Sequence, residues 1–528
     1  MTHALLAAYW LAVLGLCVYG INCLVLRRQF SRHLVAARKR LAAVRADFRA
    51  RTPDSALPHV TVQLPIFNER YVVDRLLDAV AQLDWPADRL EIQVLDDSTD
   101  DTRELAREHV QRLRRRGLDI VHLHRADRSG YKAGALKAGL AVAKGELLAI
   151  FDADFVPQAS FLRDLVPFFE DPRVGLVQAR WGHLNRDLSP LTRAQGLAID
   201  GHFSVEQAGR CWSGWILNFN GTAGMWRKSA IDDAGGWEGD TLTEDLDLSY
   251  RAQMRGWKVE YAIDVEVPAE LPGDIVAFKS QQRRWAKGSI QVARKLAPAL
   301  LRCQRLSRVT RLQALLHLTH SLAYPLMLSA AILAVPALLL WPPGLVLPGW
   351  TWITLGLVML AGTCGPNLLY VTGLKALRPH EWKRRLAELP LLMMVGMGMS
   401  VTNTRAVIEA LVGHESAFVR TPKRNLTDAS RRRGVSGYRT PLDLAFFAEA
   451  ALAGWCAWGA WIYVQQQKFF VGPFLALYAL GFGSIALLTI RDTALFARAA
   501  RREREADERA RERREEAEAA ALAEHPVS

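Results

Sequence analysis

Two pairs of carboxylates occur at the ends of apolar runs in this chain. Asp152 and Asp154 end the run ELLAIFDADF, and Asp96 and Asp97 end the run LEIQVLDD. Residues two apart on a strand point to the same side, so the first pair presents two carboxylates together. Two carboxylates, completed by phosphate oxygens and water, suit Mg²⁺ or Mn²⁺. We therefore expect Asp152 and Asp154 to hold one of these cations.

The stretches around these acids alternate between strand and helix patterns. Helices are predicted at 69–83, at 132–144 and between the second and third strands to about 116; strands are predicted at 60–67, 90–97, 118–125 and 146–155. Strands that alternate with helices of this length form βαβ units and a largely parallel sheet. Ligands of such sheets bind beyond the carboxyl ends of the strands. Both acidic pairs lie at such ends, so a shared site is expected.

A lysine and two further acids stand where helices are predicted to begin. Lys132 follows Gly130 at the start of the helix 132–144, and a helix N-terminus beside a lysine favours an anion. The GxxxxGK[ST] spacing of a P-loop does not occur there, which argues against an ATPase. Glu244 and Asp245 follow Thr243, which we expect to be the N-cap of their helix. Capping alone does not explain two adjacent acids.

Five clusters follow one another in a fixed order along the chain. They are Asp96-Asp97, Asp152-Ala153-Asp154, Thr243-Glu244-Asp245, Gln281-Gln282-Arg283-Arg284-Trp285 and Phe418-Val419-Arg420-Thr421-Pro422-Lys423. Together with the wording QLPIFNER, QVLDDSTDDT, GYKAGALK and NFNGTAGMWR, they resemble the processive family 2 glycosyltransferases, above all the cellulose synthase and cellulose synthase-like mannan/glucan synthase group. The resemblance spans about residues 58–425. It implies a GT-A-type, Rossmann-like catalytic domain that builds a β-linked polysaccharide from a nucleotide sugar.

The resemblance also implies a role for each cluster. Asp245 would be the general base, beside Glu244, in an inverting transfer. The donor would contact Pro65, Glu69, Asp96, Asp97, Lys132, Asp152 and Arg284, with the metal on Asp152 and Asp154; the acceptor would contact Gln281, Trp285, Gly221 and Thr222; and Phe418, Thr421 and Lys423 would form a gating loop. The gating pattern departs from the family at Arg420, where the family has valine.

Long apolar segments bracket the catalytic region. Residues 4–26 are apolar, uncharged and long enough to cross a bilayer, and the basic residues after them predict a cytoplasmic end. Five crossings are expected, with 388–413 as an interfacial helix, because a sixth crossing would place the basic stretch after it outside. Six full crossings are the alternative. We expect an inner (plasma) membrane protein with a cytoplasmic catalytic domain.

These features predict eight consecutive parts. They are a transmembrane helix (1–27), a cytoplasmic linker helix (28–57), the glycosyltransferase domain (58–290), an interfacial helix (291–311), two transmembrane helices (312–373), a cytoplasmic interfacial helix with the gating-like loop (374–440), two transmembrane helices (441–491) and a charged cytoplasmic tail (492–528).

The composition restricts the partners. The net charge of +13 lies largely beside the apolar spans, where topology and anionic lipid explain it, so no nucleic-acid partner is expected. The six cysteines form no CxxC pair and therefore give no zinc or disulfide pattern. The expected partners are the nucleotide-sugar donor, the growing polysaccharide and the bilayer; a second copy or an accessory subunit remains open.

Two other functions fit parts of the sequence. A non-processive enzyme that moves one sugar onto a ceramide or polyprenyl phosphate would share the aspartates and the QxxRW motif. A transporter with an inactive enzyme domain would have no need for the intact acids. UDP-glucose and GDP-mannose are both compatible with the resemblance, since no residue discriminates between them.

Overall fold

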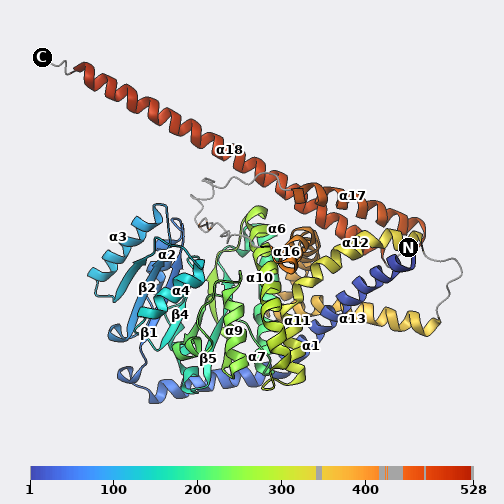
Figure 1. Ribbon diagram of the computed structural model, residues 1–528, viewed down its shortest axis with the longest axis horizontal. Coiled ribbons are helices and arrows are strands. Elements are labelled where there is room, and N and C mark those ends of the chain that lie inside the picture. Colours follow the sequence, from blue (N-terminus) through green and yellow to red (C-terminus); the bar gives the residue numbers. More distant parts are fainter. Residues whose placement is uncertain are drawn as a thin grey trace.

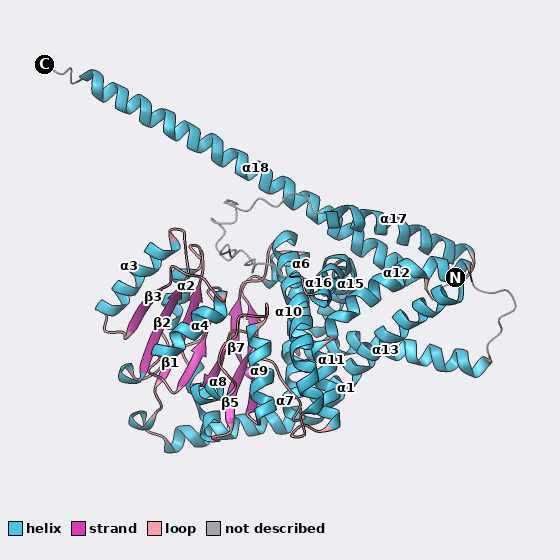
Figure 2. Ribbon diagram, in the orientation of Figure 1, coloured by secondary structure: helices cyan, strands magenta, loops and turns pink. Residues whose placement is uncertain are grey.

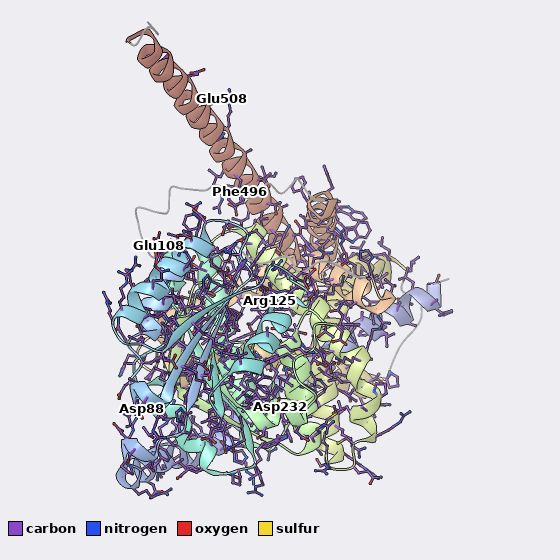
Figure 3. The ribbon with its side chains drawn as sticks, turned by 60° about the vertical axis from the view of Figure 1, so that its left-hand side comes forward. Asp88, Glu108, Arg125, Asp232, Phe496 and Glu508 are labelled. Carbon is purple, nitrogen blue, oxygen red and sulfur yellow. The ribbon has the colours of Figure 1, made fainter. Side chains whose placement is uncertain are left out.

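The computed structural model describes residues 2–340, 348–414, 423, 425, 444–468 and 471–524. An α/β body lies at one end of the molecule and a group of long helices at the other (Figure 1). The C-terminal helix α18 (Gly472–Glu524) extends beyond both, and Glu508 lies on the protruding part (Figure 3). The mixed sheet and the apolar helices beside it confirm the expected fold class.

The body is built on a seven-stranded sheet in the order β3-β2-β1-β4-β6-β5-β7 (Figure 2). β6 runs antiparallel to both of its neighbours, and the other neighbouring pairs are parallel. The strands are β1 (Val60–Ile66), β2 (Leu90–Asp96), β3 (Ile120–His124), β4 (Leu147–Ile150), β5 (Val174–His183), β6 (Gly224–Arg227) and β7 (Lys258–Ala269). The first four strands confirm the predicted ones, and their carboxyl ends meet at one edge.

Strand β4 is buried on both faces, as is usual for a central parallel strand. Leu147 and Ala149 belong to one hydrophobic core, and Leu148 and Ile150 belong to the core on the opposite face. The helices of the body are α2 (Val73–Val80), α3 (Thr102–Arg115), α4 (Tyr131–Val142), α5 (Phe161–Leu165), α6 (Pro190–Gly201), α7 (Gln207–Trp212), α8 (Lys228–Asp233) and α9 (Glu244–Arg255).

Three local predictions were wrong. β4 ends at Ile150, so Asp152 and Asp154 lie in the following turn and are not brought to one side by strand geometry. The helix expected at 69–83 is shorter, Val73–Val80, because residues 67–72 form the turn that leaves β1. Thr243 is the N-cap residue of α9, as expected, and only the capping hydrogen bond expected of its hydroxyl is not made. Thr243 packs instead against Gly288, where a Cβ would lie 2.7 Å from Thr243 Oγ1.

Five described helical segments are long and apolar enough to cross a membrane. They are Thr2–Arg51 (α1), His320–Leu339 (which includes α12, Ala323–Leu339), Gly349–Leu377 (α13), Ala445–Gln465 (in α17, Leu444–Gln465) and Gly472–Arg498 (in α18). The segment Trp382–Gly398 with α16 (Ser400–Val412) would make a sixth, but it bends by 44° after α15 (Leu389–Gly398). A bend of this kind fits a broken span or a re-entrant segment, so the topology stays a prediction.

The helix α10 (Ile275–Arg302) joins the body to these apolar helices, and α11 (Arg308–Leu318) follows it. Helix α10 carries the QxxRW motif and continues without a break past residue 290, where the catalytic domain was expected to end. Lys279 Nζ lies 2.8 Å from Glu449 Oε2 of α17, and the Ile275 amide donates to Asp492 Oδ2 of α18 over 2.9 Å. Buried contacts to two apolar helices thus fix the helix that supplies part of the site.

Candidate active site

A cavity of about 170 Å³ lies beyond the carboxyl ends of β1, β2 and β4. Most of the residues singled out from the sequence line it: Pro65, Glu69, Asp97, Lys132, Asp152, Asp154, Gly221, Glu244, Asp245, Gln281, Arg284, Trp285 and Lys423. Segments up to 358 residues apart therefore meet in one place. Of the two acidic pairs at strand ends, Asp97, Asp152 and Asp154 line this one cavity.

Asp96 and Asp97 have different environments, although they are adjacent. Asp97 lines the cavity, and Arg125, labelled in Figure 3, donates to both of its carboxylate oxygens over 2.8 and 2.6 Å. Asp96 is fully buried and accepts from the Ser98 amide over 2.8 Å, with His122 Nε2 2.8 Å from its other oxygen. Asp96 therefore holds the loop that presents Asp97, and it does not line the cavity.

The Ser98 hydroxyl, in the loop after β2, accepts from the Asn68 amide over 2.9 Å, and the Asn68 side chain accepts from the Thr99 amide. Asp100 stabilises the first turn of α3, because its carboxylate accepts from the Thr102 amide. The loops after β1 and β2 are thus bound to one another at the cavity edge.

Lys132 lies at the centre of the site. Its Nζ is 2.5 Å from Asp152 Oδ1 and 2.8 Å from the Gly221 carbonyl oxygen. Burial alone would lower the pKa of Lys132, but the charges of Asp152 and Glu244 outweigh it and raise that pKa. Lys132 is therefore a permanent cation facing the cavity, in the first turn of α4.

Asp154 receives a second lysine from a distant part of the chain. Lys423 Nζ lies 2.6 Å from Asp154 Oδ2, and the side chain of Asp154 is 3% exposed. Asn425 accepts from Arg75 over 2.8 Å, which holds the same segment against the body. Phe418 and Thr421, the other expected gating residues, lie outside the described residues.

The donor groups at this place fit a divalent cation. Asp152 and Asp154 both line the cavity and offer carboxylate oxygens, the ligands that Mg²⁺ and Mn²⁺ prefer. Each carboxylate pairs with a lysine, Asp152 with Lys132 and Asp154 with Lys423, so both carboxylates have a cationic neighbour. Asp152 is 35% exposed in its side chain and faces open space, as a ligand to an exchangeable ion must.

Glu244 and Asp245 are the first two residues of α9, and both line the cavity together with Lys132. Burial and the neighbouring Glu244 carboxylate raise the pKa of Asp245 to about 7. Burial also raises the pKa of Glu244, against the opposing charge of Lys132. A carboxyl group that titrates near neutral pH is suited to accept a proton.

Gly221 allows this close arrangement. It has φ +79°, a region that favours glycine, and a Cβ there would lie 2.8 Å from Asp245 Oδ2 and 3.2 Å from Lys132 Nζ. Thr222, next to it, is fully buried and does not line the cavity. Its hydroxyl accepts from the Asp152 amide over 2.9 Å, so Thr222 positions the turn that carries Asp152 and Asp154.

The third side of the cavity comes from α10. Gln281, Arg284 and Trp285 line it together, and Trp285 lies 6.4 Å from the ring of Trp181. Trp181 on β5 was not identified from the sequence. It belongs to an ordinary strand pattern among the chain's 16 tryptophans, and only the fold brings it to the cavity.

Arg128 was also missed. Its guanidinium lies 3.4 Å from the ring centroid of Phe67, and both residues line the cavity. They form a cationic and aromatic wall beside Asp97. An isolated Arg in a polar loop carries no signal in the sequence that would have revealed this.

Residues 58–288 match the family model described as "Glycosyltransferase like family 2". These residues are therefore similar to the members of that family. The chain is 45% identical over 258 residues to Glucomannan 4-beta-mannosyltransferase 1 of Oryza sativa subsp. japonica, a match that covers 48% of this chain and 50% of that protein. It is 47% identical over 253 residues to Glucomannan 4-beta-mannosyltransferase 2 of Arabidopsis thaliana, covering 47% of each. The matches thus span about half the length of these curated relatives.

Among solved structures, the chain is similar to a mannosyltransferase from Pyrobaculum calidifontis in complex with GDP-Man and Mn²⁺. The TM-score is 0.43 at 19% identity, over 76% of this chain and 100% of that one. The family resemblance inferred from the five clusters is confirmed for the domain that contains the first four of them.

Proposed function

We propose that this protein is a membrane-embedded, inverting glycosyltransferase that extends a β-linked polysaccharide, of the β-mannan, glucomannan or β-glucan type, one sugar at a time. The observation that carries the proposal is the position of Asp245. It lies between a cationic, carboxylate-rich side suited to a sugar diphosphate and an aromatic side suited to a sugar acceptor. The similarity to glucomannan mannosyltransferases supports GDP-mannose as the first donor to test, with UDP-glucose as the second.

The donor would lie along the side formed by Asp97, Lys132 and Asp152. Lys132 and Arg284 would neutralise the diphosphate, and the guanidinium is shaped for two phosphate oxygens. Pro65, Glu69 and the Arg128 wall would border the nucleoside. A Mg²⁺ or Mn²⁺ ion held by Asp152 and Asp154 would supply positive charge that stabilises the departing diphosphate.

Asp245 would accept the proton of the acceptor hydroxyl. That oxygen then forms a bond to the anomeric carbon on the face opposite the diphosphate, while the bond from that carbon to the diphosphate oxygen breaks. The anomeric configuration inverts, so an α-linked donor gives a β-linked product. Burial of Asp245 and its acidic neighbour Glu244 keep its basicity near that needed at neutral pH.

The acceptor sugar would rest on the ring of Trp285, with Gln281 beside it and Gly221 below. Lys423 pairs with Asp154, so a cation held by Asp154 would compete with Lys423 for that carboxylate. We also propose that the catalytic domain is cytoplasmic, that the product leaves through the apolar helices, and that Phe418, Thr421 and Lys423 belong to a gating loop.

The test is incubation of the purified full-length protein with radiolabelled GDP-mannose, UDP-glucose and other nucleotide sugars, with Mg²⁺ or Mn²⁺. Linkage analysis of a long, β-linked product from one of these donors supports the proposal. A single-sugar glycolipid as the only product would replace it with the lipid-directed alternative.

A further inference from the structure

A π-helical turn, His202–Glu206, joins α6 to α7. Such turns are rare, and they occur frequently at functional sites. The first and last residues of the turn form a pair, with His202 Nδ1 2.9 Å from Glu206 Oε2. Their side chains are 29% and 27% exposed, and neither residue lines the cavity itself. The mechanism above uses neither of them.

The pair is connected to the cavity through Asn220. His202 Nε2 lies 3.3 Å from Asn220 Oδ1, and Asn218 Nδ2 donates to the same oxygen over 3.0 Å. Asn220 lines the cavity next to Gly221, whose carbonyl oxygen accepts from the central lysine. A continuous polar chain therefore runs from the reaction centre to Glu206.

The same turn borders the aromatic side of the cavity. The His202 ring meets Phe203 edge to face at 5.1 Å, and Phe203 stacks on Trp181 at 5.0 Å. Trp181 in turn lies against Trp285. The hydrogen bonds and the ring contacts thus both link this turn to residues that line the cavity.

The π-helical turn also packs against the apolar helix α13. A Cβ on Gly201 would lie 2.4 Å from Tyr370 of α13, and one on Gly373 of α13 would lie 2.5 Å from Ser204. Burial alone would raise the pKa of Glu206, but the hydrogen bond and charge of His202, with the charge of Arg210, lower it to about 2. Glu206 is therefore a carboxylate at the junction between the cavity and a helix long enough to cross a membrane.

We propose that His202 and Glu206, together with Asn220, form an acceptor subsite for the sugar that precedes the reacting one in the growing chain. An imidazole, a carboxylate and an amide offer both donors and acceptors, as adjacent sugar hydroxyls require. The neighbouring aromatic rings would cover the apolar face of the same sugar. This inference rests on the proposed function and adds two positioning residues that hold the acceptor in line.

The test compares full-length wild type with His202→Ala, Glu206→Gln and His202→Gln. The probe is a β-1,4-linked tetrasaccharide of the sugar that the enzyme transfers, or mannotetraose if no donor is accepted. We expect His202→Ala to raise the KM for the tetrasaccharide at least tenfold, with kcat at saturating acceptor within threefold and an unchanged KM for the donor. Glu206→Gln should raise the same KM less, and His202→Gln should restore part of the loss because its amide can still donate.

His109→Ala is the matched control. His109 also bridges carboxylates, at 2.7 Å from Asp74 and 3.0 Å from Asp78, but it lies between α2 and α3 away from the cavity. We expect it to change thermal stability without changing the KM for the acceptor. An unchanged acceptor KM in His202→Ala would overturn the subsite, as would equal losses of kcat and stability in all the variants.

Binding of the tetrasaccharide without donor, followed by tryptophan fluorescence, separates this inference from the proposed function. A wild type that transfers no sugar but binds the tetrasaccharide at least tenfold more tightly than His202→Ala would refute the activity and support the subsite. Equal binding by the two proteins would overturn the subsite, whatever the activity.

Discussion

Replacement of Asp245 by Asn should separate chemistry from binding. Asparagine keeps the shape of the side chain and the start of α9, but it cannot accept the proton of the acceptor hydroxyl. Loss of a positioned general base costs ~10²–10⁴-fold in rate. In the proposed mechanism the donor contacts come from Asp97, Lys132 and Asp152, which also line the cavity, so the affinity for the donor should remain within a few-fold of wild type.

The pH dependence of kcat/KM in the wild type is a second test of Asp245 as the general base. With the pKa of Asp245 raised to about 7, the base form predominates above this pH and is lost below it. About half of the carboxyl is ionised at pH 7 and about one tenth at pH 6, so kcat/KM should fall roughly fivefold over that interval. Above about pH 8 the profile should be flat on this account, since ionisation is nearly complete.

The assay is release of the nucleoside diphosphate together with incorporation of label, measured from pH 5.5 to 9 with donor binding determined separately. Asp245→Asn should be slow at every pH and should lack the acid limb. A variant that retains wild-type turnover would show that the base lies elsewhere. Donor affinity that collapses together with turnover would make Asp245 a binding residue.

Four further variants test the site and the helix contacts that support it. Asp152→Ala and Asp154→Ala should each reduce transfer below a few per cent of wild type without unfolding the protein, and chelation of divalent ions should do the same to the wild type; substantial transfer after chelation would exclude a metal-dependent mechanism. Gly221→Ala should abolish turnover, because its methyl group would lie 2.8 Å from the carboxylate oxygen of the base. Glu449→Gln removes the buried charge that pairs with the part-buried Lys279, and breaking a buried pair costs ~3–5 kcal/mol. Thermal inactivation should then occur at a clearly lower temperature, and an unchanged temperature would contradict the role given to this pair.

Gly214→Ala is the control for the glycine variant. Gly214 also has a positive φ, +69°, but a Cβ there would have no neighbour within 4 Å. Both variants should lose a similar, small amount of stability from backbone strain, and only Gly221→Ala should lose activity. Equal activities would show that the crowding at Asp245 is unimportant.

The convergence of the motifs could be predicted from the sequence because it follows from chain topology. The acids at 96–97 and 152–154 follow strands whose parallel arrangement was readable from the alternation of strand and helix patterns. Parallel strands bring their carboxyl ends to one edge, whatever the details of packing. The first four strands and the start of α9 were therefore placed correctly.

The predictions that were wrong depended on local geometry. The run ELLAIFDADF reads as one strand, yet pairing stops at Ile150, and the turn brings Asp152 and Asp154 to the cavity by another route. Thr243 has the residue type of an N-cap, but the close approach of Gly288 on α10 takes its hydroxyl away from that role. Side-chain partners from distant segments decide such cases, and no local pattern encodes them.

Other features had no readable signal at all. Trp181 occupies a regular strand position, and the π-helical turn His202–Glu206 interrupts a stretch that reads as one helix. Asp96 and Asp97 were grouped as equivalent, but only Asp97 lines the cavity, because successive residues at a strand end point in opposite directions. Long-range packing supplies this information.

The most direct test of the account is the chemical structure of the product made by the purified full-length protein from GDP-mannose and from UDP-glucose in the presence of Mg²⁺ or Mn²⁺. The account predicts a polymer of many sugars in β-linkage, sensitive to an endo-β-mannanase or endo-β-glucanase. Such a polymer should be lost in Asp245→Asn. An α-linked product, a lipid bearing one sugar as the only product, or no transfer from any nucleotide sugar would contradict it.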